Sequence, residues 1–217
     1  PEPFPTERDY VVLLSDWTDD KPEKVYTNLK KESSLYNWQN RTLVDLWKDL
    51  RNKGVSETAA ERHMWNTMRM SDRDISDVNG TIYTFLMNGH APADGWTGVF
   101  KPGEKVRLRF INASAMTLFD IRIPGLKMKV IGSDGQLLEP FSVDEFRIGV
   151  AETYDIIVEP ESDTAYCVFA QSIDRTGYAR GTLTPNPALS ATIPAMDPLP
   201  ILTHSDMGML HTGMNHA

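Results

Sequence analysis

The sequence predicts an all-β sandwich that is interrupted near its N-terminus by a helical insertion. After residue 80, short runs of alternating apolar and polar residues are separated by turns that contain glycine or proline, which is typical of a sandwich or barrel. Between about residues 21 and 76, apolar residues recur three or four positions apart, the spacing of an amphipathic helix. We therefore expect one β domain at 8–185, with its helical insertion at about 21–76.

The clearest single strand lies at 105–111, directly after a proline-glycine turn. Its apolar residues Val106, Leu108 and Phe110 alternate with Arg107 and Arg109. Because successive side chains of a strand point to opposite faces, this pattern predicts one buried face and one face in water, with both arginines on the wet face.

The elements that precede this strand are predicted in chain order. Residues 10–14 form an apolar run rich in strand formers, which predicts a well-buried strand. Residues 43, 46, 47 and 50 are apolar and lie at helical spacing; we expect Asn40 or Thr42 to cap this helix and Gly54 to end it. A second helix is predicted to begin at Ser56 and to run to Met68.

The remaining strands follow from the same alternation. They are predicted at 81–87, 117–123, 126–131, 143–148, 153–158, 165–171 and 179–184. Asn88-Gly89, Pro124-Gly125 and Asp134-Gly135 supply turns between them. Prolines then recur without periodicity, so we expect a Pro-rich linker at 186–203, and residues 1–7 are likewise predicted to be a linker.

The composition is that of a globular protein and excludes several partners. The chain has 217 residues, 41% of them hydrophobic, and a net charge of −8. An acidic protein gains nothing from approaching a phosphate backbone, so nucleic acid is not an expected partner. No apolar run approaches the roughly 20 residues that a membrane span needs. The chain starts with Pro1 rather than methionine, and we expect a mature fragment or an excised domain.

Four strand and turn motifs occur in an order that resembles the multicopper oxidases. The motifs lie at 83–89, 102–112, 130–136 and 151–158. Together with the opening 12–18 and the helical insertion, they are similar to the second of three cupredoxin domains in the bacterial copper-resistance oxidases, and the similarity covers nearly the whole chain. The resemblance implies a cupredoxin-like Greek-key β-sandwich, with flanking cupredoxin domains of the same protein and copper ions as its partners.

The resemblance also implies an activity for the parent protein. Such enzymes are periplasmic and couple the one-electron oxidation of cuprous ion or phenols to the reduction of dioxygen to water. Their cofactors are a type 1 copper and a trinuclear copper cluster, whose ligands sit in the first and third domains. The cluster ligands are His-x-His pairs, and the type 1 site adds a cysteine flanked by histidine.

This chain departs from that copper-bearing pattern. A blue-copper site needs two imidazoles and one thiolate on one metal. Phe169, Ala170 and Gln171 stand about where a His-x-His pair would, and Val168 rather than histidine follows Cys167, the single cysteine. We therefore expect Cys167 to be a small buried hydrophobe, no catalytic residue in this chain, and a structural spacer between the outer domains.

The last residues, 204–217, form a Met/His-rich tail. Its six donors within thirteen residues are His204, Met207, Met209, His211, Met214 and His216. Thioether sulfur is a soft donor that suits cuprous ion. The tail is therefore predicted to capture Cu(I), and the alternative is a polar linker without a bound metal.

A second group of donors lies in the helical insertion and comprises His63, Met64, Met68 and Met70. Met64 and Met68 are four residues apart and share one helix face. A cuprous site is one interpretation, but methionine at this spacing is also ordinary packing, which we favour. His90 follows a turn and has no second ligand nearby in the sequence.

Two other functions remain open on the sequence alone. The chain is a candidate stand-alone copper buffer or chaperone that acts through its Met/His tail. It is also a candidate β-sandwich recognition domain with a tryptophan platform. The tryptophans considered for that platform are Trp17, Trp38, Trp65 and Trp96, of which Trp96 is placed in a turn and the others in packed segments.

Overall fold

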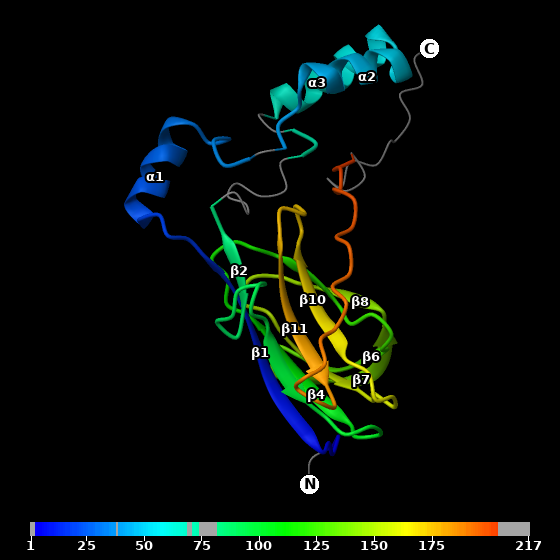
Figure 1. The fold of residues 1–217 in the computed structure, drawn as a ribbon. Coiled ribbons are helices and arrows are strands. Elements are labelled where there is room, and N and C mark those ends of the chain that lie inside the picture. Colours follow the sequence, from blue (N-terminus) through cyan, green and yellow to red (C-terminus); the bar gives the residue numbers. More distant parts are fainter. Residues whose placement is uncertain (1–2, 38, 69–70, 74–81, 204–217) are drawn as a thin grey trace.

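Two β-sheets packed face to face form the body of the protein, and three helices lie beyond one end of it (Figure 1). The structure is a computed structural model that describes residues 3–37, 39–68, 71–73 and 82–203. The predicted all-β, cupredoxin-like sandwich with a helical insertion near the N-terminus is confirmed.

The first sheet has six strands in the order β2-β1-β4-β9-β6-β7. Its strands are β1 (Arg8–Trp17), β2 (Thr84–Met87), β4 (Val106–Asn112), β6 (Met128–Ser133), β7 (Gln136–Val143) and β9 (Thr153–Val158). β1 runs parallel to β4 and antiparallel to β2. The helical insertion therefore connects two neighbouring strands, so it leaves the sheet and returns to it at the same edge.

The second sheet has five strands in the order β3-β11-β10-β5-β8. They are β3 (Trp96–Val99), β5 (Phe119–Arg122), β8 (Glu145–Ile148), β10 (Tyr166–Ser172) and β11 (Tyr178–Thr184). The core lies between the two sheets, where Phe85 and Phe119 meet edge to face at 5.6 Å between ring centroids. Val168 and Ala170 of β10 belong to the same core.

The tight turns lie where the sequence predicts them. Asn88 and Gly89 have φ angles of 51° and 80°, and Asp134 and Gly135 have φ angles of 48° and 75°. Asparagine, aspartate and glycine tolerate this left-handed conformation at low cost, and such turns match the twist of a hairpin.

The helical insertion contains α1 (Pro22–Lys31), α2 (Leu43–Lys53) and α3 (Val55–Thr67). Thr42, one of the two predicted cap residues, caps α2: its hydroxyl accepts from the Asp45 N–H at 3.3 Å, and the Asp45 carboxylate accepts from the Thr42 N–H at 2.9 Å. Gly54 ends α2 with a φ of 82° and leads directly into α3. The predicted start at Ser56 is wrong by one residue, because Gly54 rather than a side chain makes the junction.

Several other sequence predictions need correction. Arg107 is only 5% exposed, because it pairs at 2.6 Å with Asp155 of the neighbouring strand β9. Trp96 lies in β3 rather than a turn, and its ring meets Tyr10 at 5.5 Å. Trp17 is 58% exposed, although its segment was expected to be packed. The elements α1, β3 and β7 were not anticipated.

In the part of the chain that the structure describes, no helix combines the length and the apolar character that crossing a membrane requires.

Candidate functional site

Cys167 lies on β10 and is 3% exposed. Burial raises the pKa of its thiol to about 11, against a smaller opposing effect of Arg180 and Arg122. The thiol is therefore protonated at neutral pH, whereas a metal ligand must be the thiolate. This environment suits the small buried hydrophobe that the sequence predicts.

The neighbours of Cys167 on the same strand face are used for packing and hydrogen bonding. Side chains alternate along β10, so Cys167, Phe169 and Gln171 point away from the core that Val168 and Ala170 enter. The Phe169 ring lies 5.0 Å from the ring of Tyr178. Phe169 and Gln171 are both fully buried.

The described imidazoles lie on other elements. His63 is on α3 and His90 follows β2, and both are exposed. Among the described residues, no group of three or more His, Cys, Asp or Glu side chains is arranged to hold a metal ion. Two imidazoles and a thiolate do not converge here, so the described donor set does not fit a type 1 copper.

Only some residues of the predicted Met/His sites lie in the part of the chain that the structure describes. Met64 lies on α3 next to the buried Trp65, and Met68 is the C-cap residue of α3; both are half-buried. Met70 lies outside the described residues. The six donors of the tail also lie outside the described residues: His204, Met207, Met209, His211, Met214 and His216.

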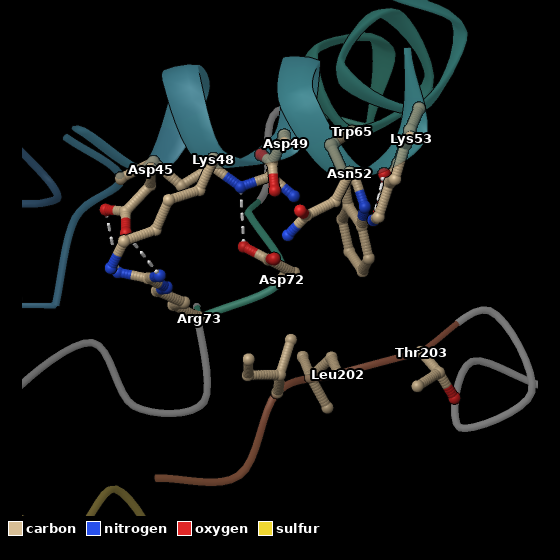
Figure 2. A pocket seen from close by; sticks show the side chains of 13 residues that line it. Asp45, Lys48, Asp49, Asn52, Lys53, Trp65, Asp72, Arg73, Leu202 and Thr203 are labelled. Carbon is tan, nitrogen blue, oxygen red and sulfur yellow. Dashed lines mark hydrogen bonds and ion pairs between the residues drawn. The ribbon is translucent and has the colours of Figure 1, made fainter. Parts of the chain in front are cut away.

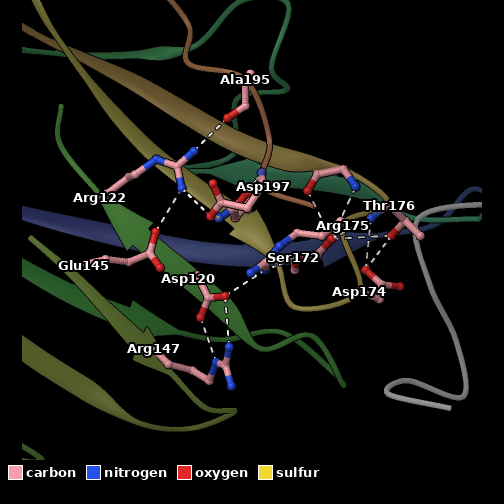
Figure 3. Close-up of polar contacts among 12 residues, drawn as sticks. Asp120, Arg122, Glu145, Arg147, Ser172, Asp174, Arg175, Thr176, Ala195 and Asp197 are labelled. Atoms are coloured by element: carbon pink, nitrogen blue, oxygen red, sulfur yellow. Dashed lines mark hydrogen bonds and ion pairs between the residues drawn. The ribbon is translucent and has the colours of Figure 1, made fainter. Parts of the chain in front are cut away.

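Residues 185–203, which we call the strap, cross the five-stranded sheet in an extended path (Figures 1 and 3). The Arg122 guanidinium donates to the Asp197 carboxylate and to the Ala195 carbonyl, each at 2.7 Å. The Asp197 N–H donates to the Gln171 side-chain carbonyl at 3.0 Å, and the Gln171 amide donates back to the Asp197 carboxylate. These bonds hold the strap over the strand face that carries Cys167.

The hydrogen-bonded position of Asp197 also affects its ionisation. Hydrogen bonds from Gln171 and Arg122 hold the pKa of the Asp197 carboxyl below its usual range, although burial works against them. Arg122 also pairs with Glu145 at 2.9 Å and lies 5.1 Å from the centre of the Phe169 ring. Sequence alternation places Arg122 on the face opposite the core, but nothing in the sequence links it to Asp197.

The far end of the strap reaches a polar cavity of about 470 Å³ in the helical insertion (Figure 2). The Leu202 N–H donates to the Asp72 carbonyl at 2.8 Å. Ion pairs line the cavity, including Arg41 with Asp72 at 2.7 Å and Arg73 with Asp45 at 3.2 Å. The strap therefore connects the sandwich to the helical insertion, and it ends where the Met/His tail begins.

Asp45 is the most strongly perturbed carboxylate of this cavity. Hydrogen bonds from the Thr42 backbone and hydroxyl, followed by one from Arg73, hold its pKa far below the usual range. Asp45 thus remains charged at any physiological pH. Its partners are a helix cap and an arginine of the same chain, which indicates a structural role.

Comparison with known proteins assigns the family. The multicopper oxidase profile matches residues 8–188. The chain belongs to the multicopper oxidase family. It is 57% identical to copper resistance protein A of Escherichia coli over 216 residues and 56% identical to the homologue of Pseudomonas syringae pv. tomato over 220 residues. Both alignments cover the whole chain but only 35% and 37% of the relatives.

Solved structures agree with this assignment at the level of the fold. The multicopper oxidase Fet3p superimposes with a TM-score of 0.56 at 16% identity, covering 93% of this chain and 32% of that one. A laccase from Botrytis aclada gives 0.51 at 19% identity, covering 87% and 32%. This multicopper oxidase chain therefore corresponds to about one third of such proteins, and the family uses copper.

Proposed function

We propose that this chain is a non-catalytic, cupredoxin-like domain of a periplasmic multicopper oxidase that confers copper resistance. The complete protein would couple oxidation of cuprous ion or another substrate to reduction of dioxygen to water. The observation that supports this proposal most directly is the face of β10 on which Cys167 lies. There Cys167 is buried, and Phe169 and Gln171 are buried with protein partners of their own, in a chain that is 57% identical to copper resistance protein A.

In this proposal the domain positions its neighbours and supplies no copper ligand. Its core is filled, its buried thiol is protonated, and its outer strand face is covered by the strap. Each of these features favours a rigid spacer over a redox centre. The periplasmic location is inferred from the resemblance to copper-resistance oxidases and from the whole-chain similarity to copper resistance protein A.

The test uses the complete protein from the reading frame that encodes this chain. We expect Cys167→Ser to leave the kcat of copper oxidation and the copper content unchanged, because serine fills nearly the same space and no copper depends on this sulfur. Loss of one copper per molecule together with loss of activity would contradict the proposal. A stability measurement on the same variant separates loss of metal from loss of fold.

A second role, Cu(I) capture by the tail, is favoured by the cluster of six soft and borderline donors at 204–216. The strap ends at Thr203, held by the Leu202–Asp72 hydrogen bond, so a cut after Thr203 removes the donors and keeps that contact. We expect this truncation to lower the number of Cu(I) ions bound. Exchanging Met64 and Met68 for leucine should leave this number unchanged, because both side chains are half-buried and leucine is of similar size. Equal stoichiometry before and after truncation would exclude the tail.

The complete reading frame that encodes this chain also distinguishes a domain of an oxidase from a stand-alone copper buffer. A frame that encodes further domains with His-x-His and His-Cys-His clusters supports the oxidase. A frame confined to this chain favours the buffer, and a frame without such clusters contradicts the oxidase proposal.

A further inference from the structure

The helical insertion buries very little of its own surface. α1 and α2 contain no buried residue, and α3 contains two, Thr58 and Trp65. Helices of ten to thirteen residues are marginal alone in water and gain most of their stability by packing an apolar face. Within the described residues, the insertion therefore packs mainly around Trp65, and most of its helical surface stays outside a core.

One apolar surface on α2 stands out. Leu43, Val44 and Trp47 are 83%, 61% and 60% exposed, and we call them the α2 apolar face. At 3.6 residues per turn these positions lie on one side of the helix. The capping box at Thr42 fixes the start of the helix, and the Arg51 guanidinium lies 5.4 Å from the centre of the Trp47 ring. The face is thus held in a defined position.

The opposite side of α2 is already engaged inside the domain (Figure 2). Asp49 pairs with Arg62 of α3 at 3.0 Å, and Lys53 pairs with Glu61 of α3 at 2.6 Å. A surface helix normally turns its apolar side to the protein and its charges to water. On α2, Leu46 and Leu50 are half-buried, but the α2 apolar face remains in water. An exposed apolar patch rimmed by polar residues marks an interaction surface.

We propose that the α2 apolar face docks onto a flanking domain of the same polypeptide. The matched relatives are far longer than this chain, which covers 35% and 37% of them, so most of each relative lies outside it. The strap ends at Thr203 beside α2 and α3, so the polypeptide continues from a point next to this helix pair. A covalently attached partner at this point has a high effective concentration.

The same residues define the chemistry of the partner surface. Leu43, Val44 and Trp47 require an apolar patch, and tryptophan is among the residues that contribute most to binding energy. Arg51 is exposed and its guanidinium lies against the Trp47 ring, so it adds a positive charge to this face. The partner surface therefore carries an apolar centre with acidic side chains at its rim. This inference rests on the proposed function, because both need the longer protein.

The experiment compares hydrogen exchange of the amides at 43–53 in the 217-residue chain and in the complete protein. We expect exchange to be at least about tenfold slower in the complete protein, because docking must be broken before α2 opens. Trp47→Lys should abolish this difference. The matched control is Tyr26→Lys, which changes an equally exposed aromatic residue on α1 and should preserve the difference. In the 217-residue chain alone, neither variant should alter exchange.

Three results would overturn the inference, and they are distinguishable. Equal exchange of α2 in the short and complete proteins contradicts docking while leaving the oxidase assignment intact. A concentration-dependent dimer of the 217-residue chain that Trp47→Lys disperses identifies a second copy as the partner. A reading frame without further domains contradicts the proposed function and removes the partner at the same time.

Discussion

Asp120 illustrates how one residue keeps a charge inside the five-stranded sheet. It is 3% exposed and accepts hydrogen bonds from Arg147 at 2.7 Å and Arg175 at 2.8 Å (Figure 3). Burial alone raises the pKa of Asp120, but the two guanidinium groups outweigh it, so the pKa lies below its usual value. Removing one member of such a cluster leaves buried charges without compensation.

We expect Asp120→Asn to lower the free energy of unfolding by about 2–4 kcal/mol, because the largely buried Arg175 loses its anionic partner. The matched control is Asp144→Asn, which breaks the ion pair between Asp144 and Lys127. These side chains are 79% and 67% exposed, so the free energy of unfolding should fall by about 0.5 kcal/mol or less. Urea unfolding measures both. Equal effects of the two substitutions would contradict this account of Asp120.

The pH dependence of stability follows from the same carboxylate. A lowered pKa in the folded state stabilises the protein above the unfolded pKa of about 4, and this contribution is lost as the pH falls through the folded pKa. Unfolding free energy should therefore fall on acidification below about pH 4, less steeply in Asp120→Asn. Urea titrations at a series of pH values test this, and identical slopes in the two proteins would exclude Asp120.

Residue-level prediction from the sequence succeeded for the core and failed for the charges. Alternation identified Val106, Leu108 and Phe110 as core residues, and all three are fully buried. It placed Arg107 in water, yet that side chain is buried against Asp155. A period of two tells which face a residue occupies, but it carries no information about a partner on a neighbouring strand.

The strap and the helical insertion are the elements that add most to the sandwich. The strap has no regular secondary structure, and side-chain bonds from Arg122 and Gln171 hold it in place. The insertion depends on Trp65, its one fully buried large side chain among the described residues. Each element can therefore be tested by one substitution.

Asp197→Ala should release the strap, because it removes the carboxylate that Arg122 and Gln171 share. We expect cleavage within 185–203 by a nonspecific protease to become roughly tenfold faster, which corresponds to a loss of about 1.4 kcal/mol of local stability. The control is Glu145→Ala, which removes the other carboxylate from Arg122 and leaves the strap bonds in place. Unchanged cleavage in Asp197→Ala would show that these bonds do not hold the strap.

Trp65→Ala should disorder the insertion selectively. Emptying this core position should lower the stability of the insertion by about 3–5 kcal/mol. Trp47→Ala provides the control. Because the Trp47 side chain is 60% exposed, its removal should lower the free energy of unfolding of this chain by about 0.5 kcal/mol or less. Far-ultraviolet circular dichroism should show loss of helix in Trp65→Ala alone. Retention of the full helical signal would contradict the role assigned to Trp65.

Sequence patterns located elements according to how strongly their own residues encode them. The cap at Thr42 and the turn at Asn88-Gly89 were found because those residue types have specific backbone preferences. β7 was missed because it is mostly exposed and contains Pro140, and β3 because four residues with Gly98 carry little pattern. Pairing with neighbouring strands, which the sequence does not display, stabilises both.

At the scale of the whole molecule, the sandwich is a frame and the strap joins it to the helical insertion (Figure 1). The sequence shows that Val168 rather than histidine follows Cys167, and the two described histidines, His63 and His90, lie on other elements. The bonds from the strap to Gln171 and Arg122 could not be predicted, since they depend on where residues 185–203 fold back.

The most direct test of this account is a Cu(II) titration of the chain truncated after Thr203, followed by absorption spectroscopy. The truncation removes the tail donors and keeps the sandwich with its strap. We predict no intense blue thiolate-to-copper band, because the Cys167 thiol is buried, protonated and without imidazole neighbours. An intense blue band that is present in this chain and absent from its Cys167→Ser variant would contradict the account.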